Sequence, residues 1–337
     1  MSKTLVRGVF ILLLLLVGCS NKKYYSPKEV FSASFAISPL NEKVVNLSRE
    51  GTTLASGKYL SSKGLSNFSL KNGFRFLNEN EKYVLATNPK GMLKVIDKET
   101  HQTFQTITLK IPVVSATIKD SMIAYVLNNN SFGLYDIASK EKLMQSRSGK
   151  IYAIDTRSAS PMFIDNIAVF PMLDGKIIIV NSQNTNSSRV VYISSSKVFN
   201  NVIFLSRIGD IMVASTSSQI ITLGGAGKKS FKANISEVVV DKEKLYLFTK
   251  EGEVKRLSST LEVLASKKYK FVHYSVATAF DNKLYALDQQ GTLIVMNDAL
   301  KKTKNYDLGK VDEPAYISQQ KLYKDGEIID LSQLGYE

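Results

Sequence analysis

Apolar and polar positions alternate in short blocks along most of the chain. The stretch at residues 283–296 (KLYALDQQGTLIVM) has an apolar run, a short polar turn with Gly291 at its corner, and a second apolar run. This pattern predicts a β-hairpin, and because both faces of each arm are apolar, we expect the arms to lie between neighbouring sheets. No period of 3.6 residues persists after residue 20, which disfavours helical repeats.

The same hairpin recurs along the chain at intervals of 34 to 43 residues, if each unit is aligned on its corner. The predicted corners are Gly51, Gly91, Gly133, Gly175, Ser218, Gly252, Gly291 and Gly326. A tight corner favours glycine because it requires a positive φ, and Ser218 stands in for the glycine in one unit.

Each hairpin is flanked by one more predicted strand on either side, such as residues 113–118 upstream of one unit and 101–108 downstream of another. Asp97 and Asp136 begin turns in which their side chains can bond nearby backbone amides. Four strands per unit of about 40 residues indicate a β-propeller blade, whereas a β-sandwich would not keep this interval.

Eight hairpins predict an all-β, eight-bladed propeller of four-stranded blades. Seven blades are the alternative, because the first unit (51–70) is irregular. The last unit ends without an outer strand, and residues 29–37 are predicted to supply it, which would close the ring and remove open sheet edges.

The first 18 residues predict a signal peptide. Lys3 and Arg7 precede an apolar run at residues 9–17, which is too short to span a bilayer as a stop-transfer helix. The run ends in Leu16, Val17, Gly18 and Cys19, which resembles the cleavage box of bacterial lipoproteins. This resemblance implies lipidation of Cys19, and the attached acyl chains would hold the protein on a membrane.

Cys19 is the only cysteine of the chain, so no disulfide can form once it is lipidated. We expect residues 1–18 to be the signal, 19–30 the lipidated cysteine and a tether, and 31–337 the propeller. Ser20 stands where aspartate would resemble an inner-membrane retention signal. We therefore expect an outer-membrane protein, lipid-anchored and facing the periplasm.

The hairpin sequence LYALDQQGTL is similar to the quinoprotein-type (PQQ-like) repeat of β-propellers. A propeller of this repeat behind a lipoprotein signal resembles the propeller lipoprotein of the outer-membrane β-barrel assembly machinery. The chain departs from that pattern in having no Trp on its outer strands, where Phe104, Leu143 and Val263 stand. The absence of Trp also disfavours WD-type propellers.

Candidate catalytic chemistry is sparse, so we expect no enzyme, no cofactor and no metal site. Quinone-dependent dehydrogenases share the repeat, but their Trp-docked blades and calcium ligands are not recognisable here. His101 and His273 are the only histidines, too few for a zinc site. Residues 224–230 (GGAGKKS) lack the first glycine of a phosphate-binding loop, and Lys229 interrupts its end.

The charge balance is strongly basic: 44 Lys and Arg against 30 Asp and Glu give +14, or +12 without Lys3 and Arg7. Such an excess can favour nucleic acid, but the predicted signal removes the chain from that partner. We expect the scattered basic residues to be solvated on loops beside anionic lipid headgroups, and a dedicated site for an acidic ligand is the alternative.

A binding surface on loops of the propeller is therefore the favoured function. Residues 181–189 (NSQNTNSSR) are predicted to form the longest connection, and we expect it to be mobile. The candidate anchors for a partner are Tyr135, Tyr152, Tyr192 and Arg157. The resemblance implies a protein partner, the β-barrel assembly complex, and we expect the chain to be monomeric outside that complex. The alternative is a lipoprotein that binds a glycan, peptidoglycan or a host protein.

Overall fold

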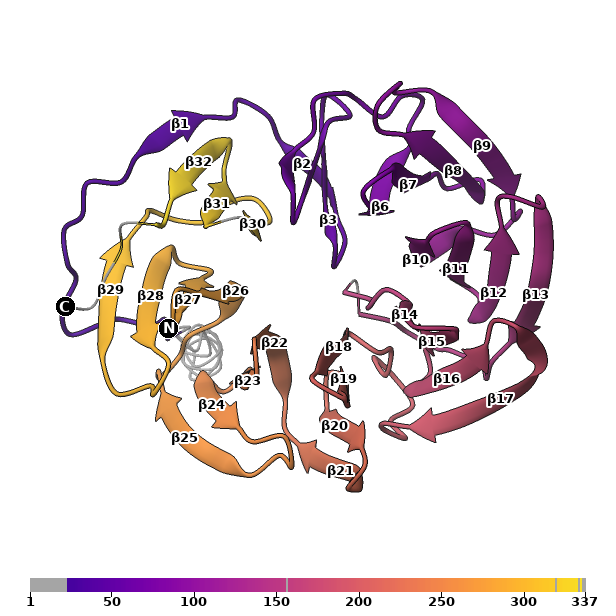
Figure 1. Ribbon diagram of the computed structural model, residues 1–337. Coiled ribbons are helices and arrows are strands. Elements are labelled where there is room, and N and C mark those ends of the chain that lie inside the picture. The colour runs from indigo at the N-terminus through magenta and orange to yellow at the C-terminus, as the bar shows by residue number, and fades with distance from the viewer. Residues whose placement is uncertain (1–22, 156, 319, 333, 335–337) are drawn as a thin grey trace, which may run out of the picture.

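A ring of eight antiparallel sheets surrounds a central opening (Figure 1). The computed structural model describes residues 23–334 except 156, 319 and 333, and these residues form strands and turns but no helix. Each sheet has four strands, so the predicted eight-bladed propeller is confirmed and the seven-bladed alternative is wrong. In the described part of the chain there is consequently no helix suited to crossing a membrane.

The strands are grouped below by their place in the blade, from the centre outwards. The innermost strands are β2 (Val44–Leu47), β6 (Arg75–Glu79), β10 (Val113–Lys119), β14 (Met162–Ile164), β18 (Phe204–Ile208), β22 (Ile235–Asp241), β26 (Tyr274–Phe280) and β30 (Tyr316–Ser318). The second strands are β3 (Gly51–Leu54), β7 (Tyr83–Thr87), β11 (Met122–Leu127), β15 (Ile167–Pro171), β19 (Ile211–Ser215), β23 (Lys244–Thr249), β27 (Lys283–Asp288) and β31 (Lys321–Lys324). The third strands are β4 (Tyr59–Ser61), β8 (Met92–Asp97), β12 (Ser131–Asp136), β16 (Lys176–Asn181), β20 (Gln219–Gly224), β24 (Glu253–Leu257), β28 (Thr292–Asn297) and β32 (Glu327–Asp330). The outer strands are β5 (Gly64–Leu65), β9 (Thr103–Thr108), β13 (Glu141–Arg147), β17 (Asn184–Tyr192), β21 (Gly227–Lys232), β25 (Val263–Lys268), β29 (Thr303–Asp307) and β1 (Ile37–Pro39). We number the blades 1 to 8 in the order of their innermost strands.

The N-terminal segment closes the ring, as predicted, but with different residues. The outer strand of blade 8 is β1 (Ile37–Pro39), paired with β32, rather than residues 29–37. The preceding residues lie along blade 7 instead, where the Phe31 N–H donates to the carbonyl of Asn305 at 2.8 Å. Phe31, Ala33 and Phe35 pack into the apolar core between blades 7 and 8, so the chain crosses this seam before it pairs.

A single backbone bond recurs at the corner between the second and third strands of all eight blades. The carbonyl at the corner accepts the N–H of a residue at or after the end of the outer strand, over 2.7 to 3.2 Å. The acceptors are Gly57, Gly91, Asn130, Gly175, Ser218, Gly252, Gly291 and Gly326. This set confirms six of the predicted corners and corrects two.

The two corrections are in blades 1 and 3. Gly51 begins β3, and the corner is Gly57 (φ 84°). Gly133 lies inside β12, where a Cβ would meet the Met144 carbonyl oxygen at 2.6 Å and the ring of Tyr125, and Asn130 (φ 66°) makes the corner. Both glycines are near the expected spacing, but one opens a strand and the other lies where its neighbours pack too closely for a side chain.

The prediction that residues 181–189 form a long, mobile connection is wrong. The chain turns tightly after Asn181 and residues 184–192 form β17, the longest strand of the described chain. Its residues are mostly exposed because it is the outer edge of blade 4, so it lacks the apolar residues by which the other strands were recognised. The longest connection is instead residues 148–161, between β13 and β14.

The core consists of layers between neighbouring blades, as blade 7 illustrates. Tyr285, Leu287 and Leu293 face the seam with blade 8, whereas Leu284 and Ile294 face the seam with blade 6. All five are 0–1% exposed. Both faces of the hairpin at 283–296 are therefore buried between sheets, as the sequence predicted.

Two predicted local features occur on the outer side of the blades. The Asp97 carboxylate accepts the N–H groups of Glu99 and Thr100 at 3.0 and 2.9 Å, which closes the predicted turn. The three residues predicted to replace outer-strand tryptophans lie on outer strands and are partly exposed: Phe104 53%, Leu143 37% and Val263 47%.

Candidate functional site

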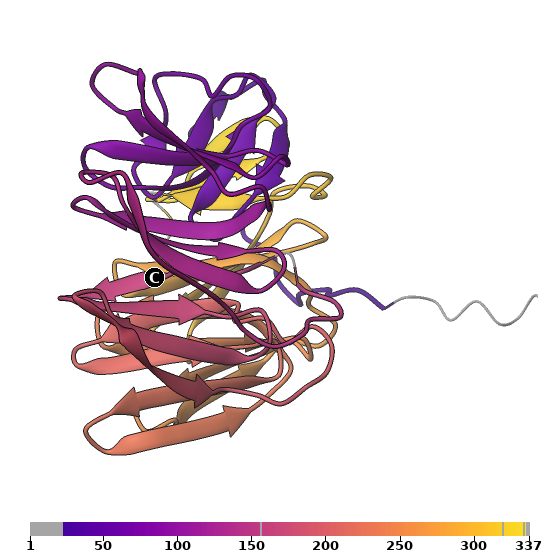
Figure 2. The ribbon, with the colours of Figure 1, turned by 90° about the vertical axis from the view of Figure 1, so that its right-hand side faces the viewer.

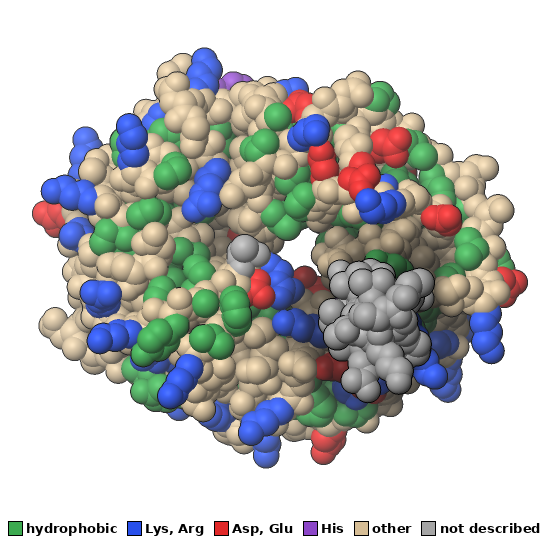
Figure 3. All heavy atoms as spheres, turned by 180° about the vertical axis from the view of Figure 1, so that it is seen from behind, with side chains coloured by type: hydrophobic (Ala, Val, Ile, Leu, Met, Phe, Trp, Pro, Cys, Tyr) green, Lys and Arg blue, Asp and Glu red, His purple; other side chains and the backbone are tan. Residues whose placement is uncertain are grey.

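One face of the ring carries the eight corner residues and the connections between blades. We call it the corner face, and Figure 3 looks onto it. The N-terminal segment leaves the ring on the same side (Figure 2). On this face the central opening is bordered by basic and acidic side chains, and hydrophobic side chains gather to its left, over blades 4 and 5 (Figure 3).

Asn201 holds the 148–161 connection at the opening. Its side chain is fully buried; its Oδ1 accepts the Asp155 N–H at 2.7 Å, and its Nδ2 lies 3.1 to 3.2 Å from the Asp155 and Arg157 carbonyls and the Ser158 hydroxyl. One side-chain amide thus supplies hydrogen-bond partners to a turn whose backbone pairs with no strand. The Ala159 N–H then donates to the Val202 carbonyl at 2.9 Å, which leads the chain into β14.

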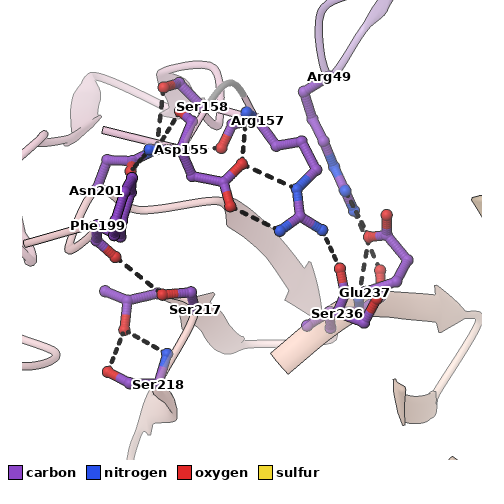
Figure 4. Close-up of polar contacts among 12 residues, drawn as sticks. Arg49, Asp155, Arg157, Ser158, Phe199, Asn201, Ser217, Ser218, Ser236 and Glu237 are labelled. Carbon is purple, nitrogen blue, oxygen red and sulfur yellow. Dashed lines mark hydrogen bonds and ion pairs between the residues drawn. The ribbon is translucent and has the colours of Figure 1, made fainter. Parts of the chain in front are cut away.

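Arg157 is bound from two sides. Its Nε and Nη2 contact the two carboxylate oxygens of Asp155 at 3.0 and 2.8 Å, and its Nη1 donates to the carbonyl of Ser236 on β22 (Figure 4). Burial alone would raise the pKa of Asp155, but the Arg157 guanidinium and its backbone N–H outweigh burial and hold that pKa below its usual range. The pair therefore connects blade 4 to blade 6.

Arg49 makes a second connection to the same strand. It extends from the turn between β2 and β3, and its guanidinium binds the Glu237 carboxylate and donates to the Val238 carbonyl at 3.1 Å (Figure 4). The guanidinium also lies 5.1 Å from the centre of the Phe204 ring. Arg49 and Arg157 thus join blades 1 and 4 to blade 6 across the central channel.

An open cavity of about 530 Å³ lies beside these arginines at the mouth of the channel. Its walls come from blades 1 to 4 and from Pro314 beside blade 8, and they are largely apolar, with Leu77, Val114 and Ile154 among them. Two guanidinium groups, Arg75 and Arg157, also line it, and Asp155 is the one acidic side chain among its lining residues. Its size falls in the range of ligand pockets, about 300–1,000 Å³.

A group of exposed apolar side chains lies on two adjoining loops of the corner face. We call Tyr152, Val198 and Phe199 the loop patch; they are 74%, 50% and 52% exposed. The Phe199 N–H donates to the Ala153 carbonyl at 2.9 Å, and the Ser217 hydroxyl donates to the Phe199 carbonyl at 2.8 Å. These bonds tie the two loops to each other and to blade 5, so the apolar groups are held outward on a fixed backbone.

The four predicted anchor residues have different roles. Tyr152 belongs to the loop patch, and Tyr192 is 61% exposed at the end of β17, with Lys176 Nζ 5.5 Å from its ring. Tyr135 packs between blades 2 and 3, where its hydroxyl accepts a bond from Gln105 at 2.6 Å. Arg157 braces the channel. Of the four, only Tyr152 and Tyr192 therefore have an aromatic ring that is largely exposed to solvent.

The sequence did not indicate the contacts that build this site, although Arg157 was a candidate anchor by residue type. Arg49 and Arg157 contact positions 188 and 79 residues away, and Asn201 looks like any loop asparagine. Val198 and Phe199 follow a serine-rich stretch, and an apolar pair there could have been noticed as unusual for an exposed connection. Periodicity finds strands, and none of these residues belongs to one.

The residues considered for catalysis lie apart in the ring. His101 is in an exposed turn of blade 2 and stacks on Phe68, while His273 precedes β26 in blade 7. Lys228 and Lys229 lie on β21, so the glycine-rich stretch is part of a hairpin. Among the described residues no group of three His, Cys, Asp or Glu side chains could hold a metal ion. Cys19 and the predicted signal lie outside the described residues.

The described part of the predicted tether contacts the propeller. The Tyr25 ring packs edge-on against Tyr269 of blade 6, with centroids 5.9 Å apart, and its hydroxyl donates to the Asn305 side chain at 3.0 Å. Lys23 Nζ lies 5.6 Å from the Phe271 ring. The chain therefore reaches the corner face at blades 6 and 7.

These features define an eight-bladed β-propeller whose loops expose an apolar patch on the corner face. The chain is similar to BamB from Moraxella catarrhalis, with a TM-score of 0.67 and 13% identity over 89% of this chain and 99% of that one. The predicted resemblance to a propeller lipoprotein of the PQQ-like repeat type is thus confirmed as a likeness of fold. The WD40 domain of Sif2 shares the fold too, with a TM-score of 0.64 at 10% identity over 89% of this chain and 99% of that one.

In sequence the chain is similar to two curated proteins, the plasminogen-binding protein PgbB of Helicobacter pylori strain J99 and that of a second Helicobacter pylori strain. The identities are 26% and 27%, over 96% of this chain and 70% of each relative. No family model matches the chain.

Proposed function

We propose that this chain is a lipid-anchored, non-enzymatic propeller that binds a protein partner through its corner face and assists the assembly of outer-membrane β-barrel proteins. The observation that carries the proposal is the loop patch. Tyr152, Val198 and Phe199 expose apolar surface on a backbone fixed by hydrogen bonds. A partner that buried this surface would gain hydrophobic free energy, and little conformational entropy would be lost in ordering the loops.

The role in barrel assembly is supported by the likeness of fold to BamB together with the lipoprotein-like sequence that ends at Cys19. An anchor at Cys19 would keep the propeller at a membrane, and the site residues offer no arrangement of catalytic groups. Lipidation is tested by metabolic labelling with a fatty acid. Cys19→Ala should abolish the label, and a label that persisted on this variant would contradict the anchor.

Partner binding is tested by purifying the native lipoprotein from gently solubilised membranes and identifying what co-purifies. We expect the barrel-assembly subunits, and we expect Phe199→Ser to reduce their yield about tenfold. Phe104→Ser, which removes an equally exposed ring from the outer strand of blade 2, is the matched control and should leave the yield unchanged. Absence of these subunits from the wild-type preparation would contradict the role in barrel assembly.

A second candidate is favoured by the similarity to the plasminogen-binding proteins: a surface-exposed propeller that binds a host protein. Treatment of intact cells with protease distinguishes the two. A periplasm-facing protein stays intact until the outer membrane is opened, whereas a surface-exposed one is cleaved at once. If the protein is surface-exposed, whole cells that have not been treated with protease should also retain plasminogen.

A further inference from the structure

Arg75 lies in the cavity at the channel mouth and forms no ion pair with any residue that the structure describes. It begins β6, and its side chain is half-buried. Its Nη2 donates to the Val113 carbonyl at 3.2 Å, whereas its Nε is buried without a hydrogen-bond partner among the described residues. Arginine has five N–H donors in a fixed fork, and a neutral carbonyl satisfies only one of them.

The contrast with Arg157, in the same cavity, shows what Arg75 lacks. Asp155 meets Arg157 with both oxygens, so that charge is compensated. Asp155 is also the one carboxylate that lines the cavity, and both of its oxygens are already engaged there. Burial lowers the pKa of Arg75, and no carboxylate of the described residues counteracts this effect. A partly buried cation without a counter-charge carries a desolvation cost, and a bound anion would offset part of that cost.

The walls of the cavity limit the kind of anion. Leu77, Val114 and Ile154 line it together with Pro112 and Pro314, so an apolar group would be buried beside the guanidinium. A fully hydrated inorganic ion would leave these walls uncovered. A carboxylate attached to an aliphatic group meets both requirements, because it can accept two parallel N–H bonds while its side chain covers the apolar wall.

We propose that the cavity at the channel mouth binds a carboxylate that carries an aliphatic group, with Arg75 as the residue that receives the carboxylate. Such a group is found at the free C-terminus of a peptide and in small aliphatic acids. The inference goes beyond the proposed function, because it concerns a pocket separate from the loop patch and holds whichever protein docks there.

The chain from residue 20 to 337 suits the test, because it keeps every described contact that closes the ring. The probes are a fluorescein-labelled peptide of about five residues that ends in leucine with a free carboxylate, the same peptide with a C-terminal amide, and isocaproate as a competitor. Fluorescence anisotropy should show that the acid peptide binds about tenfold more tightly than the amide or better, since a hydrogen bond to a charged group is lost in the amide. Competition by isocaproate as effective as that of the unlabelled acid peptide would identify a small acid as sufficient, and weak competition would identify the peptide end.

Arg75→Gln should abolish the preference for the acid peptide, while Arg189→Gln, which removes an exposed arginine of the outer strand β17, should preserve it. Arg75→Lys, which keeps the charge but not the fork, should retain only part of the preference. The acid–amide comparison on the unchanged protein needs no variant, so it remains decisive if Arg75→Gln does not fold. Equal binding of the two peptides, or no binding of either, would overturn the proposal.

Discussion

Blades 7 and 4 are built from the same four-strand unit, but they differ in what holds their connections. In blade 7 the corner glycine, Gly291, and the apolar arms on both sides of it define the structure, and most residues of the two arms are buried. In blade 4 the inner strand has three residues, and the connection before it is held by the side chains of Asn201 and Asp174. Its outer strand is polar and exposed.

The difference separates the parts of the chain that build the ring from those that are free to vary. Burial between neighbouring sheets requires apolar alternation and leaves little room for other residues. The connection at residues 148–161 has no such requirement, and it carries the exposed Tyr152 together with the Asp155–Arg157 pair. Function is therefore expected where the repeat is irregular, on a frame that the regular blades keep rigid.

The largest effect is expected from Gly291→Val in blade 7. Gly291 has a φ of 94°, and a Cβ there would overlap the carbonyl of Gly309. Backbone strain and the overlap together should cost about 4 kcal/mol of unfolding free energy or more. Gly73→Val is the control: its φ is 71° with open space around it, so it should cost about 1–2 kcal/mol. Urea unfolding measures both, and equal losses would show that close packing at the corner is unimportant.

The variant Asn201→Ala tests whether a single side chain holds the connection that leads into blade 4. This variant leaves the backbone groups of residues 155 and 157 without their buried partner, and we expect a loss of about 2 kcal/mol or more. Hydrogen exchange should accelerate at residues 150–158 before the rest of the ring. Asn184→Ala, at an exposed position of β17, should change neither quantity. Uniform exchange across the ring would argue against a separate role for this asparagine.

Asp155→Asn should produce a smaller loss that depends on pH. The pKa of Asp155 is lowered in the folded protein, so its ionised form stabilises the fold at pH values above the unfolded pKa of about 3.9. That contribution disappears as the pH falls through the folded pKa. We expect the variant to be less stable by about 1–2 kcal/mol at pH 7, and the difference to vanish in strong acid. A difference that persisted unchanged at low pH would exclude the ion pair as its cause.

The smallest effect is expected from Ser218→Gly, at the corner of blade 5. Ser218 occupies the corner by its backbone bond to Ala233, but its φ is not positive. Glycine should therefore bring no relief of strain, and its greater freedom in the unfolded chain should cost about 0.5 kcal/mol. A stabilised variant in thermal unfolding would mean that the serine is strained after all.

The same contrast explains how much of the fold could be predicted. The blade number and five glycine corners followed from apolar alternation and from the positive φ that glycine permits, and the sixth corner, Ser218, followed from the repeat interval. The sequence could not distinguish Gly133, which is needed for close packing against Tyr125, from a corner glycine, and so Asn130 was missed. β17 was missed because a polar edge strand has the composition of a loop.

The site was less predictable because its contacts join distant parts of the chain. The aromatic residue Tyr152 was selected by type alone, and it is exposed on the corner face. The isolation of Arg75 depends on which carboxylates the fold brings near it, and the pairing of Arg49 with Glu237 depends on the closure of the ring. Neither fact is encoded in local spacing.

The central claim, that the loop patch on the corner face receives a protein partner, is tested most directly by site-specific photo-crosslinking in living cells. A photoreactive residue is placed at Phe199, and a second, as control, at the equally exposed Phe104 on the outer strand of blade 2. We predict a crosslink from position 199 to a subunit of the barrel-assembly machinery and none from position 104. Crosslinks to that machinery from position 104 alone, or from neither position, would contradict the account.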